Sequence, residues 1–188
     1  MPDILTPTKS SMTIDKLVSI YGQVRGAGRL TITGKRSGKF NFTFTSDSHD
    51  TFLQFRDMLG RKTLFMEIHE SSLTAWDMIQ NEKYSDIALV VLFPFFEFLE
   101  ADGLTKVLWG IVPDIDTDNN TKLEFESSNT NIHFESERDP VGSLTRKITF
   151  SQGISSDNFE VIITQREFGT SYPHLVRVIP KFVPFVYP

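Results

Sequence analysis

The stretch from Arg29 to Thr45 constrains the fold most, because apolar and polar residues alternate along two runs that a short turn separates. The runs Arg29–Thr33 and Lys39–Thr45 follow a period of two, the spacing at which strand side chains point to opposite faces. Gly34–Gly38 between them has turn chemistry. The sequence therefore predicts a β-hairpin. Its core-facing side chains would be Leu30, Ile32, Phe40, Phe42 and Phe44.

Helix signals follow the hairpin. Three consecutive N-cap residues, Ser46 to Ser48, precede apolar residues at helical spacing, and Gly60 supplies a stop. This pattern predicts an amphipathic helix over residues 48–59. Two more helices are predicted, over residues 71–80 and from Ser85 toward Pro94, where a proline ends or kinks a helix.

Short apolar or alternating runs account for most of the remaining chain and predict strands. They lie at residues 17–24, 63–69, 104–112, 122–127, 131–137, 144–150 and 159–164. The apolar stretch 175–183 contains Pro180 and precedes Pro184, which predicts an edge strand or an extended arm. The fold class expected is α+β, with mostly antiparallel strands and two or three helices packed on the sheet. Residues 1–13 would be a flexible arm, and residues 14–188 a single globular domain.

Composition excludes several classes of protein. The chain has no cysteine, so disulfides, thiolate metal sites and cysteine nucleophiles are absent. The longest apolar stretch, residues 87–96, is well short of the ~20 residues that span a bilayer. Residues 1–13 are polar and lack the apolar centre of a secretory signal. We expect an intracellular protein that is not secreted and has no transmembrane segment.

Charge is distributed unevenly along the chain. Residues 1–46 hold seven Lys or Arg against two Asp, whereas the rest holds twelve Lys or Arg against twenty-two Asp or Glu. Such a split suggests an anionic partner for one end, or association between basic and acidic parts of two copies. The candidate anion-binding residues are Arg25, Arg29, Lys35, Arg36 and Lys39. They could meet lipid, nucleic acid or a sister subunit; the alternative is a solvated basic hairpin.

Motifs for catalysis are missing. The sequence has no phosphate-binding loop, nucleophile elbow or His-Glu-x-x-His pair, and its four histidines stand singly. We therefore expect a protein that is not an enzyme and has no cofactor. The carboxylates Asp114, Asp116 and Asp118 begin a calcium-loop pattern, but Asn119 and Phe125 stand where Gly and Glu are required. A solvated acidic turn is the favoured interpretation.

A short peptide pattern occurs near the C-terminus. Tyr172, Pro173 and Leu175 form a Tyr-Pro-x-Leu sequence, which resembles the late-budding peptides of some viral structural proteins. The simpler interpretation is a Tyr-Pro turn that leads into the final strand.

The order of predicted elements resembles the matrix proteins of rhabdoviruses, particularly the short ones of plant-infecting members. The shared features are the polar arm, the hairpin at 29–45, the helix at 48–59, a more apolar helix at 85–93 and strands in the second half. The resemblance implies a self-associating structural protein that condenses the nucleocapsid and attaches it to the membrane, in the host cytoplasm and the virion. Its partners would be itself, a nucleoprotein–RNA complex and an anionic membrane surface, with no small-molecule substrate. Lys35 and Arg36 would contact lipid or nucleocapsid, and Met1–Met12 would be the docking arm.

Two other classes stay open. Strands rich in phenylalanine, a residue with 17 copies here, are typical of an intracellular β-rich module of barrel or pleckstrin-like type. Such a module would enclose an apolar ligand or recognise a peptide. The remaining class is an enzyme whose site assembles from residues distant in sequence.

Overall fold

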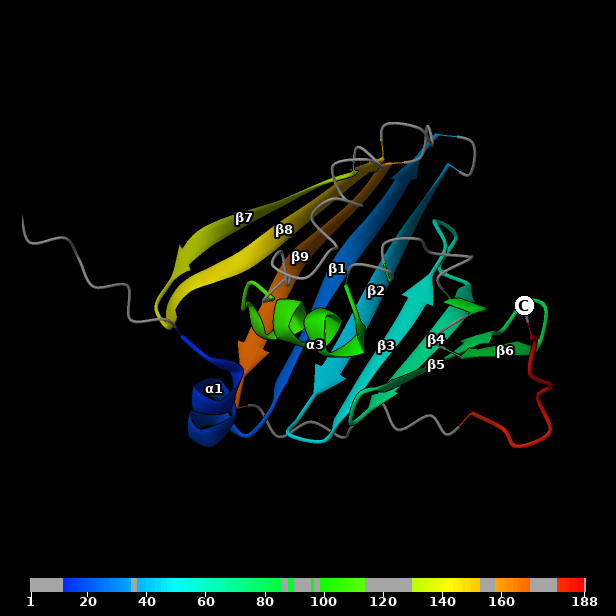
Figure 1. The fold of residues 1–188 in the computed structure, drawn as a ribbon, viewed down its shortest axis with the longest axis horizontal. Helices are drawn as coiled ribbons and strands as arrows, with labels where there is room; N and C mark the ends of the chain where they lie inside the picture. The colour runs from blue at the N-terminus through cyan, green and yellow to red at the C-terminus, as the bar shows by residue number, and fades with distance from the viewer. Residues whose placement is uncertain are drawn as a thin grey trace, which may run out of the picture.

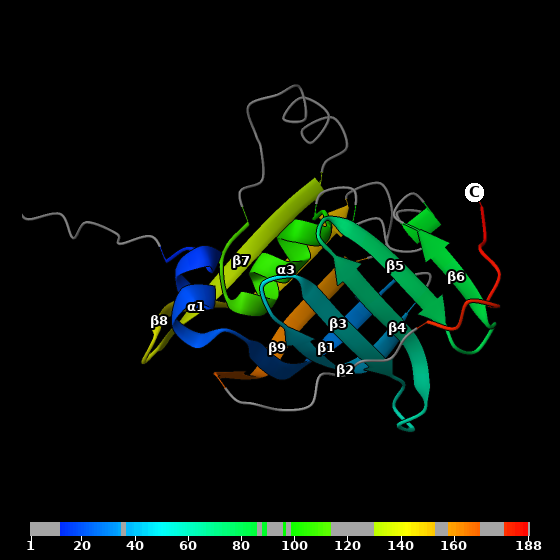
Figure 2. The same cartoon turned by 90° about the horizontal axis from the view of Figure 1, so that it is seen from below.

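A single curved antiparallel sheet dominates the computed structural model of the protein (Figures 1 and 2). The structure describes residues 12–34, 37–85, 88–89, 96, 99–113, 130–152, 158–169 and 179–187. Over these ranges it contains nine strands and two helices. Within the same ranges, no helix has both the length and the apolar character required to cross a bilayer.

The helices and strands follow one another in a simple order. Their bounds are α1 Ile14–Tyr21, β1 Val24–Thr33, β2 Gly38–Ser46, β3 Asp50–Arg56, β4 Lys62–His69, β5 Ser72–Asp77, β6 Glu82–Ser85, α3 Ala101–Trp109, β7 Thr130–Asp139, β8 Gly142–Gln152 and β9 Asn158–Phe168. The sheet order is β6-β5-β4-β3-β2-β1-β9-β8-β7. Two meanders, β1–β6 and β7–β9, therefore join side by side where β9 pairs with β1.

This architecture is mainly β, so the expected α+β fold class with two or three helices packed on the sheet is wrong. The predicted helix at 48–59 is instead strand β3 with its flanking turns. Its residues Thr51 to Phe55 are all buried, and periodicity cannot distinguish a strand buried on both faces from a helix. The N-cap signal belongs to a turn: Asp47 Oδ1 accepts hydrogen bonds from the backbone N–H groups of His49 and Asp50, at 2.8 and 2.9 Å.

Three further elements differ in type from their predictions. The predicted helix at 71–80 is strand β5 and its turn, in which Leu73 and Trp76 lie on opposite faces. The predicted strand at 17–24 is mainly helix α1, because Thr13 caps its first turn and Gly22, at φ 73°, ends it. The predicted strand at 104–112 is largely helix α3, which Gly110 ends at φ 90°. A glycine ends each helix, and Thr13 also caps the start of α1.

The hairpin prediction is confirmed. Strands β1 and β2 pair in antiparallel register, with Leu30 opposite Phe40 and Gly28 opposite Phe42. The predicted strands at 63–69, 131–137, 144–150 and 159–164 correspond to β4, β7, β8 and β9. The predicted strand at 122–127, most of the helix from Ser85 toward Pro94, and residues 1–11 of the predicted arm lie outside the described residues.

The main core lies between α3 and one face of the sheet, called here the inner face (Figure 2). Two glycines of β1 make its packing possible. A Cβ atom at Gly28 would lie 2.3 Å from the Phe42 ring, and one at Gly26 would lie 2.6 Å from the Phe44 ring. Both aromatic rings therefore lie directly over β1, where a side chain larger than hydrogen would displace them.

The opposite, outer face carries a second, smaller apolar cluster. Phe52 and Phe65 stack with ring centroids 6.1 Å apart, and Ile179 from the C-terminal segment covers them. The same segment continues along the edge of the sheet, where Lys83 N–H donates to Pro184 O and Val186 N–H to Lys83 O, each at 2.8 Å. The C-terminal segment thus protects part of the exposed edge of β6.

Candidate functional site

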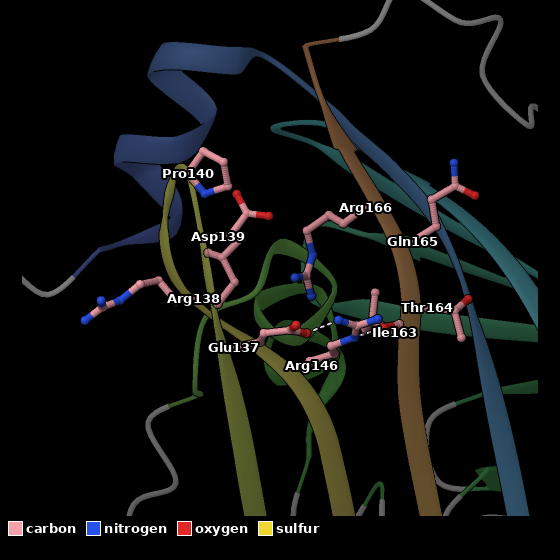
Figure 3. A pocket seen from close by; sticks show the side chains of 10 residues that line it. Glu137, Arg138, Asp139, Pro140, Arg146, Ile163, Thr164, Gln165 and Arg166 are labelled. Carbon is pink, nitrogen blue, oxygen red and sulfur yellow. Dashed lines mark hydrogen bonds and ion pairs between the residues drawn. The ribbon is translucent and has the colours of Figure 1, made fainter.

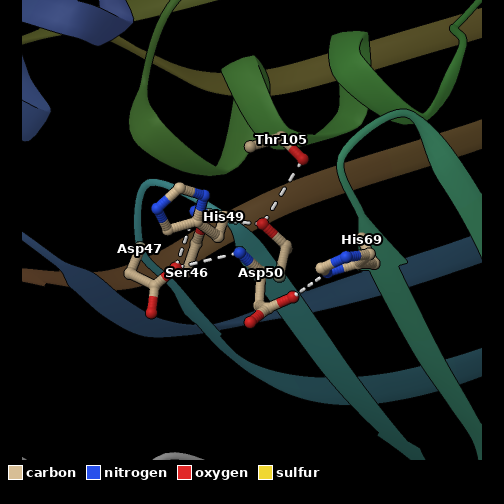
Figure 4. Close-up of polar contacts among 7 residues, drawn as sticks. Ser46, Asp47, His49, Asp50, His69 and Thr105 are labelled. Carbon is tan, nitrogen blue, oxygen red and sulfur yellow. Dashed lines mark hydrogen bonds and ion pairs between the residues drawn. The ribbon is translucent and has the colours of Figure 1, made fainter.

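Helix α3 closes one end of the inner face, called here the helix end. The Trp109 side chain is fully buried, and its indole N–H donates to Ser46 Oγ at 2.9 Å. Ser46 Oγ in turn lies 2.6 Å from Thr51 Oγ1, and Thr105 of α3 donates to the same Thr51 hydroxyl (Figure 4). These hydroxyls satisfy the polar groups that the helix brings into the core. The helix end is therefore a filled, hydrogen-bonded interior.

The other end of the inner face contains an apolar pocket of about 350 Å³. Its lining is largely aliphatic and aromatic and comes from several strands and the β5–β6 turn. The lining residues are Leu30, Ile32, Phe40, Phe55, Thr63, Leu64, Asp77, Ile79, Tyr84 and Phe159. Volume and lining both match small-molecule sites in proteins, which are concave, mostly apolar and marked by few polar groups.

Strand register explains why these residues meet. Leu30 faces Phe40 on β2 and Val161 on β9, while Phe55 pairs with Leu64 across β3 and β4. All of them lie on the half of the sheet nearest the β1–β2, β3–β4 and β5–β6 turns. This half is called here the turn end, and the contacts of α3 lie at the opposite half. The pocket is thus the part of the inner face beyond the contacts of α3.

The polar groups at the pocket come mainly from one side. Asp77 Oδ1 accepts hydrogen bonds from the N–H groups of Ile79 and Gln80, at 2.8 and 2.9 Å, and so fixes the β5–β6 turn. The Tyr84 hydroxyl donates to Glu82 Oε2 at 2.9 Å. Burial, reinforced by this hydrogen bond, raises the pKa of Tyr84 to about 12. The rim along β5 and β6 therefore carries two carboxylates and a neutral phenol.

Thr63 also lines the pocket, but its hydroxyl is buried beneath the pocket surface. The β3–β4 ladder is irregular between Phe55 and Arg56, and Thr63 sits at this irregularity between the paired Lys62 and Leu64. Its side chain is buried, and within the described part of the chain its hydroxyl has no hydrogen-bond partner. Bulges of this kind are frequent beside binding sites, and a buried hydroxyl without a partner costs free energy.

Three of the predicted anion-binding residues are among the described residues, and all three lie on the outer face: Arg25, Arg29 and Lys39. Arg25 is ion-paired with Glu167, with Nε 2.9 Å from Oε2, and this contact lowers the pKa of the Glu167 carboxyl. Arg29 and Lys39 are exposed at diagonal positions of adjacent strands. Lys35 and Arg36 lie outside the described residues. The structure therefore brings Arg29 and Lys39 together on one surface and engages Arg25 within the molecule.

The residues predicted to form a calcium loop or a late-budding peptide are not described by the structure. Residues 114–120, which include the three aspartates, lie outside the described residues, as do Tyr172, Pro173 and Leu175. Within the described ranges no three His, Asp or Glu side chains gather as a metal site would require. His69 Nδ1 lies 2.6 Å from Asp50 Oδ1 (Figure 4), and this hydrogen bond raises the pKa of His69.

Part of the pocket lining was predicted from the sequence to be buried, but as core residues and not as the wall of a pocket. Leu30, Ile32 and Phe40 were predicted to face the interior, and they do line the pocket. Phe55 was assigned to a helix, and Tyr84 and Thr63 received no role. No local pattern distinguishes an apolar side chain that contacts another from one that borders empty volume, because that depends on what covers the sheet.

Comparison with known proteins assigns no family. No protein-family model matches the chain, and no curated protein matches it. One solved structure that it resembles is that of an uncharacterized conserved protein from Thermus thermophilus. The two are 10% identical, the match covers 92% of this chain and 94% of that chain, and the TM-score is 0.42.

Proposed function

We propose that this protein is a non-enzymatic binding module that holds an apolar ligand at the turn end of the inner sheet face. The observation that carries the proposal is the pocket of about 350 Å³, lined mainly by Leu, Ile and Phe side chains. Four of these side chains are each less than a tenth exposed, so packing holds them in place: Leu30, Ile32, Phe55 and Phe159. An apolar molecule that fills this space removes apolar surface from water. This burial stabilises the complex by about 25 cal/mol per Å² of apolar surface.

The polar groups narrow the class of ligand. Asp77 and Glu82 place negative charge at the β5–β6 side, which opposes an anionic group there. The Thr63 hydroxyl is buried beneath the surface of the lining and offers no hydrogen bond to a ligand. The ligand that fits this chemistry is an uncharged, apolar chain or ring system.

Binding of a neutral apolar dye tests the proposal. We expect N-phenyl-1-naphthylamine to bind at one site per chain and to increase in fluorescence. The variant Leu64→Trp places an indole in the pocket and should abolish the signal. Thr43→Trp adds the same group at an exposed outer-face position and is the matched control. Equal dye binding by both variants, with both shown to be folded by circular dichroism, would contradict the proposal.

The matrix-like assembly stays a prediction from sequence. Its helix at 48–59 is a strand, so it now depends on the charge split and on the outer-face pair Arg29 and Lys39. Salt-sensitive oligomers in sedimentation and flotation with anionic liposomes would support it. A monomer that does not bind such membranes at any salt concentration would exclude it.

A further inference from the structure

Strands β8 and β9 separate near one end of the sheet and leave a second, polar pocket between them. They pair from Ser151 opposite Asn158 to Lys147 opposite Ile162. Beyond Lys147, β8 continues with β7, while β9 continues with β1 to Phe168. The pocket in this gap has a volume of about 320 Å³ (Figure 3).

Arg166 spans the gap. Its Nε donates to Leu108 O at 2.9 Å, and its Nη2 donates to Val107 O and Thr145 O at 3.1 and 2.8 Å. The guanidinium thus caps the C-terminal carbonyls of α3 and ties them to β8, a favourable place for a cation at a helix end. Among the described residues these bonds use only Nε and Nη2 of the fork, so Nη1 remains for another acceptor.

The charge of Arg166 is incompletely balanced. Its three acceptors are neutral carbonyls, and within the described residues no carboxylate forms an ion pair with it. Burial lowers the pKa of Arg166 to about 10; Arg146 acts in the same direction, and Asp139 opposes both. A partly buried cation that is still protonated at neutral pH is stabilised by any anion that reaches it.

Arg146 supplies a second guanidinium beside the first. Its Nε donates to Ile163 O at 3.2 Å, and its Nη1 is ion-paired with Glu137. Both side chains of this pair are about half exposed, so solvent screens the contact and Glu137 can move away at small cost. Figure 3 shows Arg166, Arg146 and Glu137 turned toward a common space, whereas Arg138 points away from it.

We propose that this polar pocket is a binding site for a phosphate group, held between Arg146 and Arg166, with the Glu137 carboxylate paired with Arg146 when no phosphate is bound. Two adjacent guanidiniums match a phosphate in charge and in the geometry of their paired N–H donors. The site is separate from the apolar pocket and does not depend on the ligand proposed there.

Titration calorimetry of the full chain at low salt tests the site. The probes are inorganic phosphate, glycerol 3-phosphate, dihexanoyl phosphatidic acid below its micelle concentration, and acetate. We expect phosphate-bearing probes to bind and acetate to bind at least tenfold more weakly. Tighter binding of the phosphatidic acid than of glycerol 3-phosphate would identify a lipid headgroup; equal binding of the two would identify a soluble phosphate. Equal affinity for acetate and phosphate would overturn the assignment.

Three variants locate the binding. Arg146→Met should weaken phosphate binding about tenfold, because it removes a charged hydrogen-bond donor. Glu137→Gln should strengthen it about fivefold, because it removes the competing carboxylate. Arg138→Gln removes an equal charge that points away from the pocket, and should leave the affinity within about twofold. Failure of both wild type and Glu137→Gln to bind phosphate, or equal losses in Arg146→Met and Arg138→Gln, would overturn the proposal. The side chains at all three positions are exposed, and circular dichroism would confirm that each variant is folded.

Discussion

The two ends of the inner face use the same strands but differ in what fills them. At the helix end, Trp109 and Leu108 are completely buried against the sheet, and Trp109 is hydrogen-bonded to Ser46. At the turn end, Leu30 and Phe55 are just as apolar, yet they border about 350 Å³ of space. Apolar character alone therefore does not separate core residues from residues that line a pocket. The difference is volume, because protein interiors are normally packed without such gaps.

The largest expected effect on stability comes from removing the Trp109 side chain, which anchors α3 at the helix end. Trp109→Ala should lower the free energy of unfolding by about 4 kcal/mol, because it leaves a cavity and deprives Ser46 of a donor. Leu64→Ala at the turn end should cost only about 1 kcal/mol, because that side chain already borders empty volume. Urea unfolding measures both. Similar losses would mean that the two ends are equally packed.

A smaller effect is expected where the aromatic rings cross β1. A Cβ atom at Gly26 would lie 2.1 Å from Gln165 O and 2.6 Å from the Phe44 ring. Gly26→Val should therefore lower the unfolding free energy by about 2 kcal/mol through overpacking. Ala27→Val, on the neighbouring residue, should change it by less than about 0.5 kcal/mol, since valine suits a strand. Thermal unfolding that shows the two variants to be equal would contradict the close approach of Phe44.

Removing the hydroxyl of Thr63 at the turn end is expected to increase stability. Thr63→Val removes a buried group that has no partner among the described residues, and should raise the unfolding free energy by about 1 kcal/mol. The same variant should bind an apolar ligand as tightly as the wild type does, because the hydroxyl is closed off from the pocket. A loss of stability in urea unfolding would show that the hydroxyl is already satisfied.

The smallest effect concerns the pH dependence of stability through the exposed contact between His69 and Asp50. The hydrogen bond and charge of Asp50 raise the pKa of His69 above 6.5, and the nearby Glu70 and Glu67 add to the rise. The bonded, protonated His69 therefore stabilises the folded chain fully below about pH 6.5, and this contribution is lost as pH rises through the raised value. The unfolding midpoints of wild type and His69→Gln should converge as pH increases from 6 to 9. A constant difference would exclude protonation as the cause.

Much of the β-structure was readable in the sequence, whereas the helical assignments were not. Strict alternation in the hairpin predicted its two strands, since only one face of each is buried. Residues 51–55 are buried on both sides by the inner core and by the outer cluster around Phe52, so their apolar residues do not alternate and their spacing also fits a helix. Asp47 had the chemistry of an N-cap but serves a turn, because the same carboxylate can accept from the backbone in either setting.

By itself the sequence determined that the chain is rich in strands, that the hairpin at 29–45 has a defined inner face, and that cysteine chemistry is absent. Alternation and composition are local properties, and they do not depend on what the strands pack against. Only the tertiary structure decided that α3 covers one half of that face, and that Arg146 and Arg166 meet where β8 and β9 separate. Both pockets are volumes between elements distant in sequence, so they depend on strand order and on the position of α3.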